Sequence, residues 1–200
     1  MTDAMTAEHQ ALNDLLKPEE ASHVAVRSGD WSDPSTWEGG RVPGAGADVH
    51  IPMGVAVTYD VARDAELDVV RVDGGLHFAT DVDTKMVVDT LFTGHHSHLT
   101  IGTRDKPVES GVQAEIVIAD KGAIDLSKDP GQFGRGVVTQ GKVEIEGASK
   151  PPYLKLAEEP SAGDTTLKLE GDVGSWSVGD SLVVMGTEYV GQDAAGILQT

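Results

Sequence analysis

Cysteine is absent from the 200-residue chain, and aromatic residues make up only 4% of it. Without cysteine the protein forms no disulfides and no thiolate metal sites. No hydrophobic run approaches the length of a membrane-spanning helix, so we expect no insertion into a membrane. Residues 1–16 contain neither a basic stretch nor an apolar run, and no signal peptide is recognisable in this chain.

Positive charge is also scarce. The chain carries 33 acidic residues against 15 Lys and Arg, a formal net charge of -18, and the acidic residues are spread over both halves. A protein of this charge repels nucleic acid and anionic membranes unless it has a local basic patch, and none is visible. We therefore expect no nucleic-acid partner and only weak affinity for a polyanion, which leaves a neutral glycan open as a ligand.

Glycine and small apolar residues are plentiful instead. With 24 glycines and 39% hydrophobic residues, the composition favours a turn-rich all-β protein. Residues 29–51, GDWSDPSTWEGGRVPGAGADVHI, hold too many prolines and glycines for a long helix or strand. Trp31 and Trp37 make this segment too apolar for a solvated linker. We expect a compact loop that covers one end of the fold, although the two rings could instead stack on sugars.

A strand–turn–strand pattern recurs after this loop. The second strands begin at Val55, Leu76, Leu99, Ile124 and Val143. The repeat thus returns about every 19 to 25 residues, which is typical of a solenoid. Because each repeat holds strands, and parallel crossovers favour the right hand, we predict a single-stranded right-handed parallel β-helix. Its N-terminal cap would include a short α-helix within residues 6–16, where apolar residues have helical spacing.

Alignment of the repeats predicts which side chains stack on neighbouring strands. The inward columns should hold Val55, Val57, Leu76, Phe78, Leu99, Ile101, Ile124, Leu126, Val143 and Ile145. The outward column should hold Ala56, His77, Thr100, Asp125 and Glu144, about 4.8 Å apart. In the adjoining sheet, His50 and Arg71 should be outward neighbours.

Several motifs, in their order along the chain, resemble the eight-glycine (G-eight) domain family. They are W-x-x-P-x-x-W-x-x-G-x-x-P at 31–43, GADVHI at 46–51, GGLHF at 74–78, HLTIGTRDKP at 98–107, FGRG at 133–136, GKVEIEGASKPPYLKL at 141–156, AGDTTLKL at 162–169 and WSVGDSLVV at 176–184. On this basis we divide the chain into an N-terminal extension or cap at 1–22, an eight-glycine-type β-helix domain at 23–190, and the start of a continuing segment at 191–200.

The family includes segments of fibrocystin and of the cell-migration-inducing hyaluronan-binding proteins, along with bacterial relatives. The resemblance implies an extracellular or cell-surface, polysaccharide-associated protein. Three functions follow as alternatives: a carbohydrate-associated module of a larger bacterial surface or secreted protein with further coils or domains C-terminal to this chain, a hyaluronidase-like hydrolase or polysaccharide lyase, and a structural stalk or adhesin segment.

Candidate ligand-binding residues cluster around the longest spacing between repeats. Arg104 and Lys106, beside His96, are the best local positive charge in an acidic chain. An arginine can hold a uronate carboxylate with two hydrogen bonds. Arg71 stands on a face that could line a groove. The alternative for these side chains is ordinary ion pairing at the surface.

Catalytic candidates are His77, Asp125 and Glu144, which the alignment places on outward positions. Glycoside hydrolysis needs two carboxyl groups about 5 to 10 Å apart, and the alignment puts Asp125 and Glu144 on adjacent turns. A solvated polar ladder is the alternative for these residues.

Two groups of side chains could bind a metal ion. His95, His96 and His98 offer imidazole nitrogens. Asp81 and Asp83 place two carboxylates on one side of a turn, which suits calcium. Neither group has a complete ligand set in the sequence, so we expect no firm cofactor and leave calcium open as a ligand.

Overall fold

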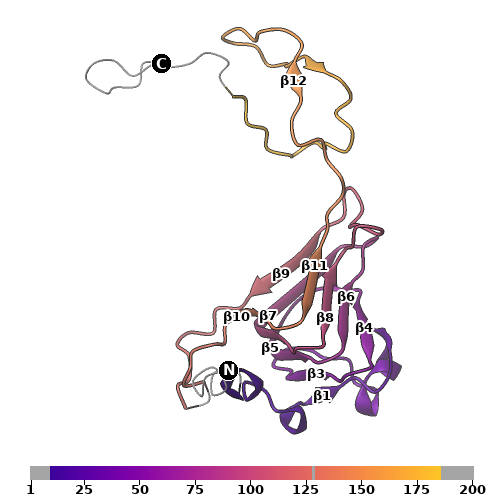
Figure 1. Cartoon of the computed structure of the whole chain (residues 1–200), viewed down its shortest axis with the longest axis vertical. Helices are drawn as coiled ribbons and strands as arrows, with labels where there is room; N and C mark the ends of the chain where they lie inside the picture. The colour runs from indigo at the N-terminus through magenta and orange to yellow at the C-terminus, as the bar shows by residue number, and fades with distance from the viewer. Residues whose placement is uncertain (1–9, 128, 186–200) are drawn as a thin grey trace, which may run out of the picture. The chain divides into compact units, whose positions relative to one another are not determined.

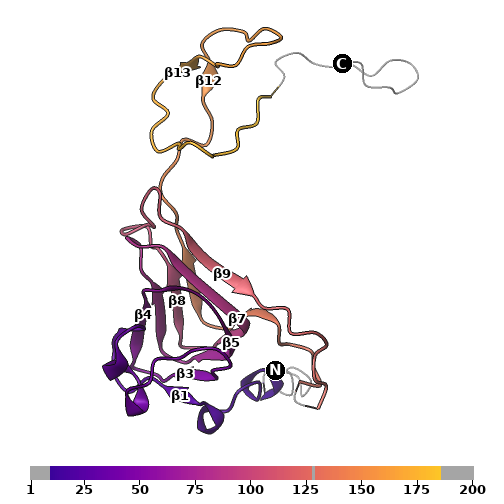
Figure 2. The ribbon, with the colours of Figure 1, turned by 180° about the vertical axis from the view of Figure 1, so that it is seen from behind.

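The computed structural model describes residues 10–127 and 129–185. The chain divides into two compact units, residues 1–149 and residues 150–200. Figures 1 and 2 show the strand-rich first unit from opposite sides. It carries almost all of the regular structure.

Two parallel sheets make up the first unit. The first sheet holds β1 (His23–Val24), β3 (Val49–Ile51), β5 (Ala62–Val72), β7 (Thr84–Thr93), β9 (Ala114–Ile118) and β10 (Gly136–Thr139). The second sheet holds β2 (Gly29–Asp30), β4 (Ala56–Tyr59), β6 (Gly75–Phe78), β8 (His98–Ile101) and β11 (Lys142–Ile145). Consecutive strands alternate between the sheets up to β9, and both β9 and β10 pair with β7.

Short helices lie before and within the tryptophan loop. Residues 10–13 are α-helical, which agrees with the expected helix, and residues 6–9 of that prediction lie outside the described residues. Three 3-10 helices follow: η1 (Pro18–Glu20), η2 (Pro34–Thr36) and η3 (Glu38–Gly40). The Asp33 side chain accepts a hydrogen bond from the Ser35 amide at the start of η2, as Asp does at helix N-termini.

The predicted single-stranded right-handed parallel β-helix is wrong. The described residues of the first unit form two parallel sheets, and these do not close into a solenoid. Most repeats supply one strand to each sheet, but β9 and β10 follow one another in the first sheet with no described strand of the second sheet between them. The repeat length in the sequence predicted how often strands recur along the chain. It could not predict how many strands each repeat contains.

The core lies between the two sheets and is closed at one end by aromatic rings. Trp31 and Trp37, here called the tryptophan pair, are 1% and 2% exposed. Their ring centroids lie 4.8 Å apart, edge to face, and the Trp37 indole N–H donates to the Trp31 carbonyl oxygen at 2.8 Å. Tyr59 continues the stack toward Phe78. The burial of both tryptophan rings leaves no exposed ring face on which a sugar could stack.

The observed register confirms part of the predicted alignment. Leu76, Leu99 and Val143 lie in one column, and His50 pairs with Arg71. In the first repeat the observed register differs from the predicted one by two residues: Val57, and not Val55, pairs with Leu76. Residues 124–126 form no strand, so β11 pairs directly with β8.

Gly102 shows why a turn between the sheets requires glycine. Its φ is +72°, and a Cβ atom there would collide with the carbonyl oxygen of Glu146. Glycine alone tolerates both the left-handed backbone and this close approach. The turns after β8 and β11 can therefore stack as closely as their strands do.

The second unit has little regular structure. It contains a short antiparallel pair, β12 (Lys155–Leu156) and β13 (Leu169–Glu170). The Trp176 indole N–H donates to the Pro151 carbonyl oxygen at 3.0 Å, and Lys150 forms an ion pair with Asp180 at 2.7 Å. These contacts join the beginning of the unit to residues 176–180.

Truncation of the tryptophan pair tests its role in the core. We expect Trp31→Ala to lower the free energy of unfolding by about 3 to 5 kcal/mol, because it leaves a large cavity beside Trp37 and Tyr59. Urea unfolding followed by far-UV circular dichroism measures this change. Val26→Ala is the control, since Val26 is 56% exposed. A loss for Trp31→Ala as small as that of the control would contradict the role.

Candidate functional site

A ladder of polar side chains crosses the outer face of the second sheet. Register places Asp30 beside Thr58, Thr58 beside His77, His77 beside Thr100, and Thr100 beside Glu144. Their sequence neighbours Val57, Leu76 and Leu99 are fully buried in the core. Because side chains alternate along a strand, the ladder faces away from the core. We call these five residues the polar ladder.

A second row beside the polar ladder brings two histidines together. His98 pairs with Gly75 and with Lys142. The His77 and His98 ring centroids are 6.0 Å apart, and the rings meet edge to face. A Cβ atom on Gly75 would lie 2.7 Å from His77 Nε2, so the absent side chain of Gly75 makes room for the His77 ring.

The two imidazoles differ in their hydrogen bonds. His77 Nδ1 lies 2.8 Å from the Thr100 hydroxyl. Burial, together with the neighbouring His98, lowers the pKa of His77, so it is neutral at neutral pH. The His98 Nε2 atom is buried and has no hydrogen-bond partner. An unsatisfied buried nitrogen is costly to the folded state.

Glu144 ends the polar ladder and connects it to the loop after β8. Its carboxylate lies 3.2 Å from the Lys142 ammonium and accepts the Arg104 amide at 3.3 Å. The hydrogen bond from Lys142, followed by that from the Arg104 amide, lowers the pKa of Glu144. The carboxylate is therefore ionised at neutral pH. The side chains of Arg104 and Lys106 are exposed on this loop.

The structure thus joins His77, His98, Glu144 and the Arg104 loop on one face, but it leaves other predicted site residues elsewhere. His95 and His96 are exposed in the turn between β7 and β8. Asp83 accepts the Gln113 amide at 2.9 Å, and Asp81 lies in the same exposed segment. Asp125 lies in a loop, where it accepts the Ser127 amide and hydroxyl, whereas Glu144 is on β11.

Arg71 is held inside a buried cluster that the sequence did not reveal. Its Nε donates to Asp73 Oδ2 at 2.8 Å, and His50 Nε2 lies 2.9 Å from the same oxygen. Arg71 Nη1 donates to the carbonyl oxygens of Asn13 and Leu16. The cluster therefore fastens the segment before η1 to the first sheet. The signal in the sequence was the spacing of Arg71, near the end of β5, and Asp73, just after it, because residues two apart in an extended chain point to the same side.

Electrostatics explains why this cluster is stable. Burial alone would raise the pKa of Asp73, but hydrogen bonds from His50 and Arg71 and the positive charge of Arg71 outweigh it and hold the pKa below its usual value. Asp73 is thus an ionised partner that satisfies the half-buried guanidinium of Arg71, as a buried charge requires.

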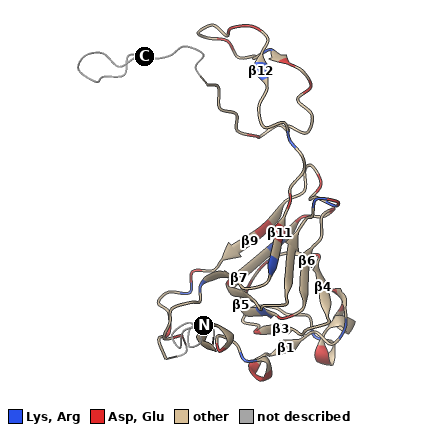
Figure 3. Cartoon of the chain, in the orientation of Figure 1, with Lys and Arg blue, Asp and Glu red and all other residues tan. Residues whose placement is uncertain are grey.

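A polar cavity of about 780 Å³ lies in the first unit and contains Asp125. Arg135 forms one wall, where its guanidinium contacts Asp89 and donates to the carbonyl oxygens of residues 121–123. Lys121 is paired with Asp68. Sequence reasoning missed this cavity, because the FGRG motif gave no sign of where Arg135 would reach. Figure 3 shows how acidic and basic residues are interspersed along the ribbon of the first unit.

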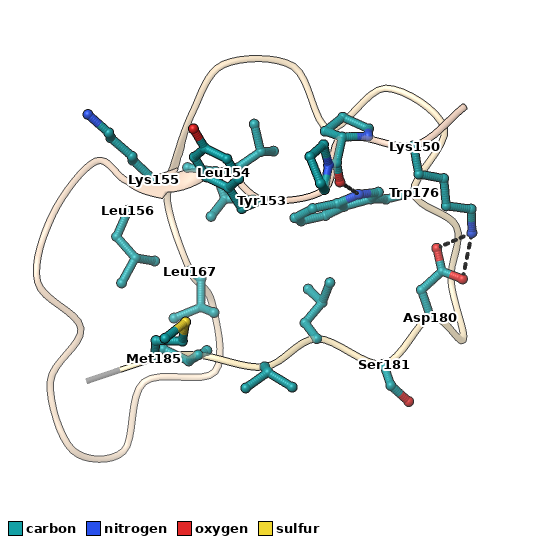
Figure 4. A pocket seen from close by; sticks show the side chains of 16 residues that line it. Lys150, Tyr153, Leu154, Lys155, Leu156, Leu167, Trp176, Asp180, Ser181 and Met185 are labelled. Carbon is teal, nitrogen blue, oxygen red and sulfur yellow. Dashed lines mark hydrogen bonds and ion pairs between the residues drawn. The ribbon is translucent and has the colours of Figure 1, made fainter. Parts of the chain in front are cut away.

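A second cavity, of about 930 Å³, lies within the second unit. Figure 4 shows Trp176 and Tyr153 on one side of it, with Leu167 and Met185 on another, and the Lys150–Asp180 pair at its edge. Its lining is mostly apolar, and none of the predicted site residues contributes to it.

The described residues contain no metal cluster, and the carboxyl groups with a shifted pKa are all shifted downward. No three His, Asp or Glu side chains among residues 10–127 and 129–185 come together as a metal ion would require. Each carboxyl group with a shifted pKa in this part of the chain, for example Asp33 and Glu144, is shifted downward. A general acid in glycoside hydrolysis needs the opposite shift.

Fold and site together define a small all-β domain of alternating parallel strands with a polar outer face. The family model of the G8 domain matches residues 36–157, more than half of the chain. The chain therefore belongs to the G8 domain family, which confirms the resemblance seen in the motifs. The G8 domain is typical of extracellular proteins. No helix in the described part of the chain is long and apolar enough to cross a membrane. Neither the curated proteins nor the solved structures contain a match to this chain.

The buried cluster predicts how stability depends on pH. Because the pKa of Asp73 is lowered by folding, its stabilising effect is complete above the usual Asp value and disappears as pH falls through the lowered value. We expect Asp73→Asn to lower the free energy of unfolding at neutral pH by about 2 kcal/mol. The variant should also lose less stability than the wild type below about pH 4.

Urea unfolding at a series of pH values measures this difference. Asp64→Asn is the control, because Asp64 also pairs with a basic residue but its side chain is 88% exposed. Curves for the wild type and Asp73→Asn that stay parallel into the acid range would disprove the assignment.

Proposed function

We propose that the first unit is an extracellular carbohydrate-binding module that holds an acidic polysaccharide along the polar ladder. The observation that carries this proposal is the register, which lines up two carboxylates, two hydroxyls and one imidazole from Asp30 to Glu144 across five adjacent strands. Groups spaced about 4.8 Å apart on a rigid sheet suit an extended polymer with regularly spaced hydroxyl groups.

Basic side chains at one end of the polar ladder suit the acidic part of such a polymer. Arg104 and Lys106 are exposed beside Glu144, and Lys142 is the basic residue of the neighbouring row. Arg104 can bind a uronate carboxylate through two hydrogen bonds. The net charge of -18 opposes a polyanion at long range, so the affinity is weak and depends on the local contacts.

Binding is better supported than catalysis. The two carboxylates considered for hydrolysis, Asp125 and Glu144, belong to a loop and to β11 respectively. Glu144, ionised and hydrogen-bonded, suits the orientation of a sugar better than proton donation. The proposed biological setting is a bacterial secreted or surface protein in which this module accompanies other domains.

Binding assays with a soluble polyuronate and with neutral dextran test the proposal. We expect the 200-residue chain to bind the polyuronate weakly, and the double variant Arg104→Ala/Lys106→Ala to bind about tenfold less well, since it loses two charge-assisted contacts. Lys85→Ala is the matched control, because Lys85 lies on the first sheet and pairs with Asp64. Equal losses in both variants, or no binding at all, would refute the proposal.

A parallel assay separates binding from catalysis. Incubation with each polysaccharide, with calcium and with EDTA, should release no new reducing ends or unsaturated products. Product release that disappears in His77→Gln or Glu144→Gln would replace the binding proposal with the hydrolase or lyase. If neither binding nor turnover is detected, the stalk or adhesin is the function that remains.

A further inference from the structure

The two ends of the first unit are built differently. The tryptophan pair closes the core beside β1 and β2, whereas the last strands of both sheets expose side chains that continue the core columns. Val137 is 46% exposed, Val143 38% and Ile145 64%. Their register partners one strand further in are at most 8% exposed: Leu91, Leu99 and Ile101. The apolar columns thus end without cover.

The backbone of β11 also has an open edge. The Lys142 amide donates to the Ser97 carbonyl oxygen, and the Glu146 amide donates to that of Ile101. Both bonds run toward β8. Since backbone groups alternate in direction along a strand, those of Val143 and Ile145 point the other way. Among the described strands β11 pairs with β8 alone, so this edge can accept another strand.

We propose that this open end is the interface with a second copy of the chain, in which the β11 strands of two copies pair antiparallel about a twofold axis at Val143. The charges on β11 favour this arrangement. Antiparallel pairing centred on Val143 places Lys142 opposite the second copy's Glu144, and Glu144 opposite the second copy's Lys142. Opposite charges facing each other across strands are attractive.

Other pairings of the same edge lack this complementarity. A parallel, in-register pair would set Lys142 against Lys142 and Glu144 against Glu144, and like charges directly opposite each other are destabilising. The twofold arrangement also covers Val143 with its own counterpart and uses the same edge in both copies. It therefore closes as a dimer and does not continue into a filament.

The dimer would also change the outer face of the second sheet. Glu144 is the last member of the polar ladder, and the second copy would add its own ladder across the new strand pair. A polymer bound there would meet two sets of side chains. The inference rests on the edge of β11 alone, so it can hold or fail independently of the proposed ligand.

A single cysteine tests the predicted register in the intact chain, which has no cysteine of its own. Val143 would face itself at a Cα separation of about 5.5 Å, which suits a disulfide. Under mild oxidation, Val143→Cys should form a covalent dimer at least about tenfold faster than the control, given this pre-alignment. The control is Val82→Cys, because Val82 is similarly exposed, at 45%, in a loop away from β11.

Charge exchange provides a second, independent test. Lys142→Glu and Glu144→Lys each create two repulsive pairs, so each should raise the dimer dissociation constant, measured by sedimentation equilibrium, by about tenfold. The double variant Lys142→Glu/Glu144→Lys should restore it. A chain that stays monomeric overturns the proposal. A dimer whose dissociation constant is unchanged by these substitutions, and which forms no disulfide in Val143→Cys, also overturns it, because such a dimer uses another surface.

Discussion

The rest of this domain depends on one constraint: each strand pairs in parallel with the corresponding strand of the next repeat. It sets each residue beside its counterpart on the next turn, so one face of every strand builds an apolar column and the other builds a row of polar groups. The core column through Leu76 and Leu99 and the polar ladder through His77 and Thr100 are two sides of the same register. Any change that shifts one strand by a residue would exchange core and surface for that strand.

Local alternation made part of this arrangement predictable. Leu76, Leu99 and Val143 could be aligned from the sequence because each lies in a short strand with regular alternation. The register of the first repeat was predicted wrongly because residues 52–55 form a turn, in which Gly54 has a φ of +83°, and β4 begins only at Ala56. Residues 124–126 form no strand, and the segment just before them is held by Arg135, which donates to the carbonyl oxygens of residues 121–123. The prediction of a closed β-helix was wrong because the period of the repeat does not show how many strands each repeat contains.

In the candidate site, too, the residues on regular strands could be predicted from the sequence, and those that depend on tertiary packing could not. His77 and Glu144 were identified because they occupy outward positions of aligned strands, and the structure places both on the polar ladder. Asp125 was aligned with them only through the strand that does not form. The Asp73 cluster could not be derived, since it depends on the distance between a β3 histidine and a residue beyond β5. Such contacts arise when successive repeats pack against each other. In a single sequence their members appear only as separate charged residues.

The separation of the tryptophans has a spectroscopic consequence. The chain has three: Trp31 and Trp37 lie edge to face in the first unit, and Trp176 lies in the second. The close pair should show exciton coupling in the near-ultraviolet and energy transfer between its rings, whereas Trp176 emits as a single fluorophore. Each unit therefore carries its own natural optical reporter, and replacement of Trp176 by phenylalanine would leave a tryptophan signal that belongs to the first unit alone.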